Sequence, residues 1–384
     1  MIIRNGTVLH VNRLERGADA RIDGPTIVEI GVGIRAQDEH TVDATGCYVL
    51  PGFIDLHTHG LRHVYVQEGG WREYAALQLE QGVTGCLPTL FGPPAVVVEA
   101  MQRGRAETAD LQDTPNLLGF RLEMPYLAKP GAGQTSDLVA ITDDATAVMW
   151  EASGGKVRLW DVSPELPGAL PFIRWAAARG IIISMAHTHA TWQEARAAVD
   201  AGLSLVTHFY DTFDVPPQTD GGVFPAGLTD YVQIEDRLVA EIIPDGVHVH
   251  PFLVEKTLRC KGLGRVAFVT DSVRGAGSPP GIYSGLYPGA EVEVTADRGV
   301  RRVGDDALSG SALTMAQAFR NAVQRFGRSV GEASVLCSAT PAAVLGARRK
   351  GYLAAGMDAD LVLLDAELNV RATVVGGILS LQSS

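Results

Sequence analysis

Apolar residues recur in short runs along the first 50 residues, and glycines and polar pairs separate the runs. This pattern is typical of short strands joined by turns and predicts a small antiparallel sheet. The expected strands are residues 2–3, 7–9, 20–22, 26–30, 41–43 and 48–50, with 359–365 and 370–377 near the other end. Because chain termini usually lie close together at the surface, we expect residues 1–50 and 346–384 to form one small β-sandwich domain.

Between residues 51 and 345 short apolar runs alternate with longer amphipathic stretches. After the run that ends at His57, the expected strands are residues 85–89, 117–123, 156–160, 181–187, 203–208, 238–243 and 266–271. The expected helices are residues 71–81, 94–110, 166–179, 191–201, 251–261 and 313–326. Eight strands that alternate with helices predict a (β/α)8 barrel over residues 51–345. A doubly wound open sheet is the alternative architecture.

Composition narrows the functional classes. The chain of 384 residues is 46% hydrophobic, which suffices for a barrel-sized core and a smaller domain. Its net charge of -12 argues against a nucleic-acid partner. The sequence has no apolar run of the length of a signal peptide core or a membrane span, so we expect a cytoplasmic protein without membrane attachment. Its four cysteines have no CxxC spacing and are expected to stay reduced.

The predicted strand ends carry ionisable side chains. His57 and His59 end the opening strand, and side chains two residues apart in a strand point to the same face. Other predicted strands end at or beside Glu123, His187, His208 and Asp271. In a barrel these ends meet at one rim, where imidazoles and carboxylates form a ligand set for a divalent cation. The structural alternative is that each carboxylate caps a loop or helix and each imidazole binds backbone carbonyls.

A series of short motifs covers nearly the whole chain. They are residues 50–60 (LPGFIDLHTHG), 81–84 (QGVT), 87–89 (LPT), 123–127 (EMPYL), 186–191 (AHTHAT), 207–208 (TH), 244–251 (PDGVHVHP), 269–271 (VTD), 308–315 (LSGSALTM) and 356–362 (GMDADLV). In this order they resemble the amidohydrolase superfamily and, within it, the N-acetylglucosamine-6-phosphate deacetylases. The resemblance implies that His57 and His59 hold one metal ion, that His187 and His208 hold another, and that Glu123 reaches or bridges both.

The resemblance also implies the remaining chemistry. Zinc is the expected ion, with iron, manganese or nickel as alternatives, and the number of ions is one or two. Asp271 is expected to take a proton from the attacking water and to deliver it to the departing nitrogen. His248 corresponds to a substrate-binding histidine, with a structural loop histidine as the alternative. Members of the family are commonly dimers, so a homodimer is a candidate assembly.

Departures from the family pattern concern substrate recognition. In the deacetylases, basic residues in the segment that corresponds to residues 208–222 grip the sugar phosphate; here this segment has no Lys or Arg, and its Asp211 would repel a phosphate. Gln134 stands near the position of a family histidine, and Arg274 stands where relatives have small residues. We expect Asp211, Gln134 and Arg274 to contact the substrate, with Arg274 as an anion clamp or, alternatively, an exposed loop residue. His189 replaces a usual Asn and is expected in a supporting or surface position.

These observations predict metal-dependent hydrolysis of an amide bond in a small N-acyl substrate. Deacetylation of an N-acetyl amino sugar is the leading hypothesis, with the sugar phosphate open. The second hypothesis is hydrolysis of a cyclic amide or an N-acyl amino acid, with Arg274 holding a carboxylate. A catalytically silent binding module on the same fold and a nucleobase deaminase are further alternatives.

Overall fold

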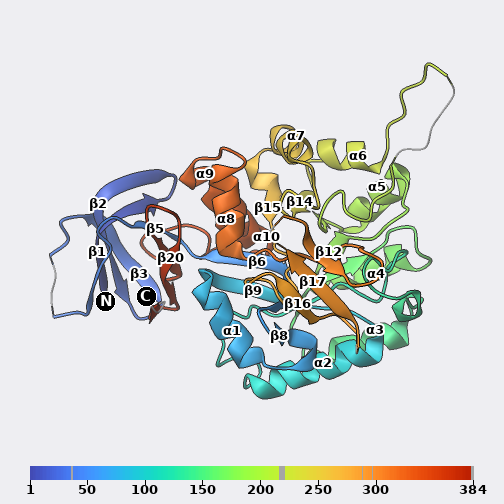
Figure 1. Ribbon diagram of the computed structural model, residues 1–384, viewed down its shortest axis with the longest axis horizontal. Coiled ribbons are helices and arrows are strands. Elements are labelled where there is room, and N and C mark those ends of the chain that lie inside the picture. The colour runs from blue at the N-terminus through green and yellow to red at the C-terminus, as the bar shows by residue number, and fades with distance from the viewer. Residues whose placement is uncertain (36–37, 216–220, 288, 296, 382–384) are drawn as a thin grey trace.

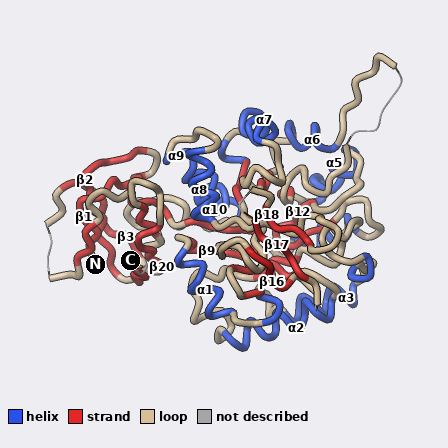
Figure 2. The backbone as a smooth tube through the Cα atoms, viewed as in Figure 1, coloured by secondary structure: helices blue, strands red, loops and turns tan. Residues whose placement is uncertain are grey.

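The computed structural model describes residues 1–35, 38–215, 221–287, 289–295 and 297–381. Figure 1 shows a large body of strands and helices beside a smaller sheet that combines strands from the first and last parts of the described chain. Helices lie around the outside of the large body and its strands lie inside (Figure 2). Within the described residues, no helix has the length and apolar character needed to cross a membrane.

The smaller sheet combines strands from both ends of the chain, in the order β21-β20-β19-β5-β1-β2-β3, with β4 beside β1. Its strands are β1 (Ile2–His10), β2 (Arg13–Asp23), β3 (Thr26–Val32), β4 (Thr41–Asp43), β5 (Tyr48–Pro51), β19 (Leu361–Leu364), β20 (Val370–Val375) and β21 (Ile378–Leu381). β1 is antiparallel to β2 but parallel to β4 and β5, so the expectation of a purely antiparallel N-terminal sheet is wrong for these two strands. Tight turns reverse the chain between β1, β2 and β3, whereas the longer connection after β3 brings β4 and β5 alongside β1 in the same direction.

The large body is built on eight parallel strands in the order β15-β14-β13-β12-β11-β10-β9-β6. They are β6 (Phe53–Thr58), β9 (Val83–Leu90), β10 (Phe120–Leu122), β11 (Val157–Val162), β12 (Ile182–Met185), β13 (Leu205–Val206), β14 (Val239–Ile242) and β15 (Val266–Phe268). Every residue of β6 and β9 is buried, as expected for parallel strands covered on both faces. The chain passes from β5 of the smaller sheet to β6 through Gly52.

The two edge strands of this sheet meet through the segment that follows β15. The Asp271 N–H donates a hydrogen bond of 2.8 Å to the His57 carbonyl, and the His59 N–H donates one of 2.8 Å to the Ser272 carbonyl. Thr58 and Ser272 also form a parallel bridge. The sheet therefore closes on itself at its carboxyl end, which confirms the predicted (β/α)8 barrel and excludes the open sheet.

All six predicted helices are present, within a few residues of the expected bounds. They are α1 (Trp71–Glu80), α2 (Pro94–Glu107), α4 (Ala169–Ala177), α5 (Trp192–Ala201), α7 (Pro251–Lys261) and α8 (Met315–Gln324). Several elements were not predicted from the sequence pattern. The helical ones are α3 (Asp143–Ala152), α6 (Leu228–Ile234), α9 (Val330–Ser334), α10 (Thr340–Val344) and the short helical turns at Val66–Glu68, Thr135–Asp137, Leu263–Arg265 and Val335–Ala339. The others are the hairpin of β7 (Gly60–Leu61) and β8 (Val64–Tyr65) and the antiparallel sheet of β16 (Gly281–Ser284), β17 (Glu291–Thr295) and β18 (Gly299–Arg302).

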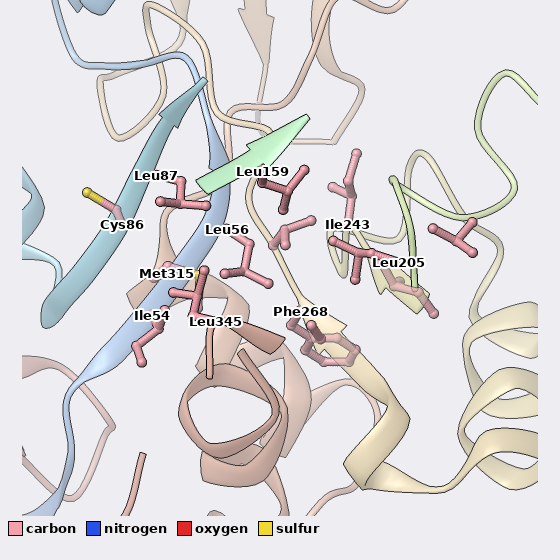
Figure 3. Packing of buried hydrophobic residues seen from close by; sticks show 14 of the residues in the cluster. Ile54, Leu56, Cys86, Leu87, Leu159, Leu205, Ile243, Phe268, Met315 and Leu345 are labelled. Atoms are coloured by element: carbon pink, nitrogen blue, oxygen red, sulfur yellow. The ribbon is translucent and has the colours of Figure 1, made fainter. Parts of the chain in front are cut away.

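The interior of the barrel is packed with aliphatic side chains from facing strands. Figure 3 shows Leu56 of β6, Leu159 of β11 and Leu205 of β13 pointing toward one another, with Phe268 of β15 beside them. The smaller sheet encloses a separate core that includes Val8 and Leu361. The filled barrel leaves space for chemistry at the strand ends.

Candidate metal centre and active site

The six ionisable residues at the predicted strand ends lie together at the carboxyl end of the barrel, and all six are buried. They come from or directly follow five strands: His57 and His59 from β6, Glu123 from β10, His187 from β12, His208 from β13 and Asp271 from β15. Among them, His187, His208 and Asp271 have φ angles of 44°, 26° and 49°. The backbone therefore turns into the left-handed region soon after each strand, a conformation that is uncommon outside glycine and gathers at functional sites.

Glu123 lies between two pairs of histidines. Its Oε2 atom is 3.1 Å from His59 Nε2 and 3.4 Å from His57 Nε2. Its Oε1 atom is 3.0 Å from His187 Nε2 and 3.3 Å from His208 Nε2. Within each pair the two Nε2 atoms are 3.1 Å apart. One carboxylate thus presents a different oxygen to each of two three-ligand groups.

This donor set fits a divalent metal. Zinc binds imidazole nitrogen and carboxylate oxygen at about 2.0–2.2 Å, which places neighbouring tetrahedral ligand atoms roughly 3.3–3.6 Å apart. The separations of 3.0–3.4 Å around Glu123 are close to that spacing. In each histidine pair the two Nε2 atoms face each other and also face Glu123. A single hydrogen bond can pair only two of these three groups, whereas one cation can bind all three.

The charge balance of the cluster supports the same interpretation. Burial lowers the pKa of His59, but hydrogen bonds to Asp271 and Glu123 raise it to about 9. Burial also lowers the pKa of His208, whereas its hydrogen bond to Glu123 raises it to about 10. Burial raises the pKa of Asp271, but the charge of His57 and the hydrogen bond from His59 lower it to about 2. The carboxylates therefore stay ionised, and the site attracts positive charge.

Asp271 stands beside the first histidine pair. Its Oδ1 atom is 3.2 Å from His59 Nε2 and 3.4 Å from His57 Nε2. Its backbone is fixed by the pairing with His57 that closes the barrel. A carboxylate held at this position can exchange a proton with a molecule bound beside the ligand group of His57, His59 and Glu123.

A cavity of about 100 Å³ opens onto the cluster, and the predicted substrate residues His248 and Asp211 line it. His248 Nδ1 is 2.7 Å from Asp245 Oδ2, which leaves its Nε2 available to a ligand. Apolar walls come from Phe91, Leu286 and Leu308. Neither Lys nor Arg is among the described residues that line the cavity.

Comparison with known protein families matches residues 48–379 to the amidohydrolase family. The chain belongs to this family. This amidohydrolase is 30% identical to an N-acetylglucosamine-6-phosphate deacetylase from Lysinibacillus sphaericus over 390 residues, which cover 100% of the chain and 98% of the relative. It is 32% identical to an N-acetylgalactosamine-6-phosphate deacetylase from Escherichia coli O157:H7 over 341 residues, which cover 86% and 87% of the two chains.

Solved structures give the same relationship. An N-acetyl-D-glucosamine-6-phosphate deacetylase from Mycobacterium smegmatis matches this amidohydrolase with a TM-score of 0.88 and 28% identity, over 99% of this chain and 100% of that one. A mutant of that enzyme in complex with N-acetyl-D-glucosamine-6-phosphate matches with a TM-score of 0.87 and 28% identity, over 100% and 99% of the two chains. The family and the ligand groups together describe a metal-dependent amidohydrolase that acts on a carbon–nitrogen bond other than a peptide bond.

Two predicted substrate residues of this amidohydrolase do not line the cavity. Arg274 forms an ion pair with Glu68 and lies over the ring of Tyr65, with 5.6 Å between the guanidinium carbon and the ring centroid. Gln134 is exposed and precedes the helical turn at 135–137, where its backbone N–H donates to the Tyr287 hydroxyl at 3.0 Å. The structure thus gives no support to direct contact of either residue with a substrate in this cavity.

The acidic segment after His208 is partly neutralised by a residue that the sequence did not single out. Lys129 Nζ lies 2.5 Å from Asp214 Oδ1 and donates to the Thr212 carbonyl at 3.0 Å. His189 is exposed, as expected, and its Nδ1 atom is 2.7 Å from Asp214 Oδ2. Residues 216–220 of the same predicted segment lie outside the described residues.

A buried ionic network beneath the cluster was also missed. Arg121 is fully buried and donates to Glu241 Oε1 at 2.7 Å and to the Leu56 carbonyl at 3.0 Å. It also donates to both carboxylate oxygens of Asp161, at 3.1 Å. The available signal was the presence of charged residues inside the largely apolar strands β10, β11 and β14, because an unpaired charge at such a position is strongly disfavoured.

Proposed function

We propose that this amidohydrolase removes the acetyl group from an N-acetyl amino sugar. The observation that carries the proposal is the arrangement of Glu123 between two histidine pairs with Asp271 at the first of them. Support also comes from the relative from Lysinibacillus sphaericus, which is 30% identical over the whole chain. We further propose zinc as the ion, with two ions bound through Glu123.

A bound divalent ion lowers the pKa of water from 15.7 to about 7 and polarises a carbonyl oxygen. In the proposed mechanism Asp271 Oδ1 accepts a proton from the water that attacks the amide carbon. The same carboxyl group then protonates the departing nitrogen, because an amine leaves readily only after protonation. His248, held through Nδ1 by Asp245, donates from Nε2 to the substrate carbonyl oxygen or to a sugar hydroxyl.

Whether the substrate carries a phosphate group is a separate question from the removal of its acetyl group. Cavity-lining residues supply no guanidinium or ammonium group within the described part of the chain. Lys129 is the cation beside the segment after His208, and it is engaged by Asp214. We therefore propose an N-acetylhexosamine as the substrate class and leave its phosphorylation to experiment.

The test is a coupled assay for acetate release after zinc reconstitution. Substrates are N-acetylglucosamine, N-acetylgalactosamine and their 6-phosphates, with Asp271→Asn as the inactive control. Acetate release by the wild type from any of the four supports the proposal, and the comparison of phosphorylated with free sugars defines the substrate. If a cyclic amide or N-acyl amino acid is hydrolysed and none of the four sugars is, the amino sugar proposal is wrong. Absence of turnover on the whole panel favours the silent binding module.

We also propose a cytoplasmic location and a homodimer. Within the described chain the four cysteines are unpaired, and Cys260 is exposed, which suits a reducing compartment. Light scattering of the purified protein at several concentrations tests the dimer directly. A mass of 40.8 kDa throughout would mean a monomer.

A further inference from the structure

A second cavity lies behind the wall of the catalytic cavity. Its volume is about 570 Å³, and it is bounded by α8, by β17 of the small antiparallel sheet and by the loops that follow β14 and β15. Both α8 and β17 are drawn in orange in Figure 1. This cavity is several times larger than the catalytic one, and no step of the proposed mechanism uses it.

Two guanidinium groups line this second cavity without a carboxylate partner. Within the described residues, the hydrogen-bond partners of Arg320 and Arg325 are amide and backbone oxygens, and neither forms an ion pair with a carboxylate. Arg320 donates to the amide oxygens of Gln317, at 2.9 Å, and Asn369, at 2.6 Å. Arg325 donates to two backbone carbonyls, those of Asp245, at 2.8 Å, and Gly246, at 3.4 Å. Because these partners are neutral, both guanidinium groups keep their charge available for an anion.

The neutral residues of the second cavity suit a ligand that carries hydroxyl groups. Thr314, Ser278 and Thr295 contribute hydroxyls to the lining, and Asn321 contributes an amide. Such groups bind polyols, whereas the arginine forks bind oxyanions through paired hydrogen bonds. The lining therefore matches a small molecule with an oxyanion at one end and hydroxyls elsewhere.

Asp245 belongs to the wall between the two cavities. Asp245 lines the second cavity, while its Oδ2 atom holds His248, which lines the catalytic cavity. Its Oδ1 atom accepts the backbone N–H groups of Val247, at 2.8 Å, and His248, at 3.0 Å. The negative charge of Asp245 is thus committed to the His248 loop and does not neutralise the arginines.

The same turn is held from the other side by α8 and the residue after it. Arg325 binds the Asp245 carbonyl, and the Asn321 side chain donates to the Pro244 carbonyl at 2.9 Å. An anion that draws the Arg325 guanidinium toward itself competes with the Asp245 carbonyl. The position of His248 then depends on whether the second cavity is filled.

We propose that the second cavity is a regulatory site for a phosphorylated, sugar-sized molecule, which binds Arg320 and Arg325 and acts on catalysis through Asp245 and His248. The predicted effect of the ligand on turnover rests on the proposed function, whereas binding of the ligand to the second cavity does not. Coupling between two sites is reciprocal, so substrate binding changes the affinity of the second site by the same factor.

Binding is tested by calorimetry on the zinc-loaded protein with glucose 6-phosphate, which has no amide to hydrolyse. Inorganic phosphate, glucuronate and glucose serve as comparison probes for the phosphate, the carboxylate and the hydroxyls. The first variant is Arg320→Gln, and the second is Arg320→Lys, which keeps the positive charge but loses the paired N–H donors of the guanidinium group. The control is Arg174→Gln, because Arg174 is exposed on α4. We expect Arg320→Gln to weaken glucose 6-phosphate at least tenfold, Arg320→Lys to weaken it less, and Arg174→Gln to leave it unchanged.

Kinetics on an N-acetylhexosamine then separate the two cavities. We expect glucose 6-phosphate to change kcat in the wild type and to lose that effect in Arg320→Gln. Binding that is equal in the wild type and Arg320→Gln, or inhibition that is purely competitive and survives the substitution, places the probe in the catalytic cavity and overturns the proposal. Tighter binding of glucuronate than of glucose 6-phosphate overturns the assignment to a phosphate. Absence of acetate release with intact, Arg320-dependent binding contradicts the proposed function and leaves the binding site standing.

Discussion

Glu241 Oε2 lies 3.8 Å from His57 Nδ1 in the floor of the active site, and neither atom has a closer hydrogen-bond partner in the described part of the chain. Both side chains are fully buried. The other oxygen of Glu241 is held by Arg121. The carboxylate therefore favours the tautomer of His57 that carries its proton on Nδ1, with the lone pair of Nε2 directed to the ion position.

Replacing Glu241 by Gln tests this relationship. Arg121 requires an oxygen at the position of Oε1, so the new NH2 group faces His57 Nδ1, where two donors repel each other. The histidine is then driven to the tautomer whose Nε2 carries the proton and cannot bind metal. We expect the ion held by His57 and His59 to bind about 10–100-fold more weakly, while the ion at His187 and His208 is retained.

The measurement is metal content by mass spectrometry after dialysis against graded chelator. Asp161→Asn is the matched control, because Asp161 also binds Arg121 but does not face His57. Equal metal content and chelator sensitivity of Glu241→Gln and the wild type would contradict the orienting role. Loss of both ions together with a lowered thermal midpoint would indicate general destabilisation of the floor.

Asp271→Asn tests the proton transfer. The amide keeps the shape of the carboxylate but cannot accept and return a proton, so we expect kcat to fall by about 10²–10⁴-fold. The metal content of the variant should equal that of the wild type, because Glu123 and the four histidines form both ligand groups without Asp271. A variant with full metal and nearly normal kcat would remove Asp271 from the catalytic step.

Gly131 tests how closely the loop after β10 approaches the metal site. A Cβ at Gly131 would lie 2.3 Å from His187 Cε1, and the residue has a φ of 55°. Gly180 has a φ of 72° and open space around its Cβ position, so Gly180→Ala reports the backbone strain alone. We expect Gly131→Ala to lower metal content and activity at least tenfold and Gly180→Ala to lower only the thermal midpoint, since left-handed strain costs about 1–2 kcal/mol. Similar activities of the two variants would show that His187 tolerates the displacement.

Arg274→Ala separates the two substrate hypotheses. Because Arg274 pairs with Glu68 and does not line the cavity, we expect its removal to leave kcat/KM unchanged for neutral and charged substrates alike. The measurement is kcat/KM for an N-acetylhexosamine and for an N-acyl amino acid. A selective loss on the carboxylate-bearing substrate would restore Arg274 as an anion clamp.

Lys261 gives a prediction for alkaline pH. Burial and the charge of Arg265 lower the pKa of Lys261 to about 8, while its Nζ donates to the Val232 and Glu235 carbonyls. In the unfolded chain the pKa is about 10.4. Between these values the unfolded state binds more protons, so the contribution of Lys261 to the unfolding free energy rises with pH.

We therefore expect the difference in unfolding free energy between the wild type and Lys261→Met to grow from pH 8 to pH 10. Urea unfolding at pH 6, 7, 8, 9 and 10 measures it, and below about pH 7 the difference should be constant. The hydrogen bonds that the variant loses add an offset at every pH and do not alter the trend. A difference that stays flat across the range would show that Lys261 keeps its proton in the folded state.

The barrel and the ligand cluster were predictable because both leave regular marks in the sequence. Apolar runs of strand length predicted that His187 and His208 lie at strand ends, and parallel strands in a barrel bring their carboxyl ends to one rim. The surroundings were harder, because they depend on partners remote in the chain. Arg274 is turned toward Glu68, which is 206 residues away, and no local pattern indicates such a pairing.

Two omissions have other physical causes. The strand β17, with its alternation of acidic residues and valines, carries a clear strand pattern, but it lies outside the strand and helix repeat on which the barrel prediction rested. The carboxylates that accept hydrogen bonds from the buried Arg121 stand on strands that follow it by 40 and 120 residues. Such networks are visible in sequence as isolated charges in apolar strands, but their partners are set by the register of the closed sheet.

The seam at Thr58 and Ser272 joins the first barrel strand to the segment after the last, 214 positions further along. Until that seam forms, the first pair of imidazoles lacks its aspartate, because Asp271 arrives with the closing segment. A nascent chain that has emerged only as far as β14 therefore has all five residues of the two ligand groups, but it has an open ring and no proton acceptor beside the first histidine pair. Proton transfer, unlike the assembly of the ligand groups, therefore requires that synthesis has passed the seam and that the ring has closed.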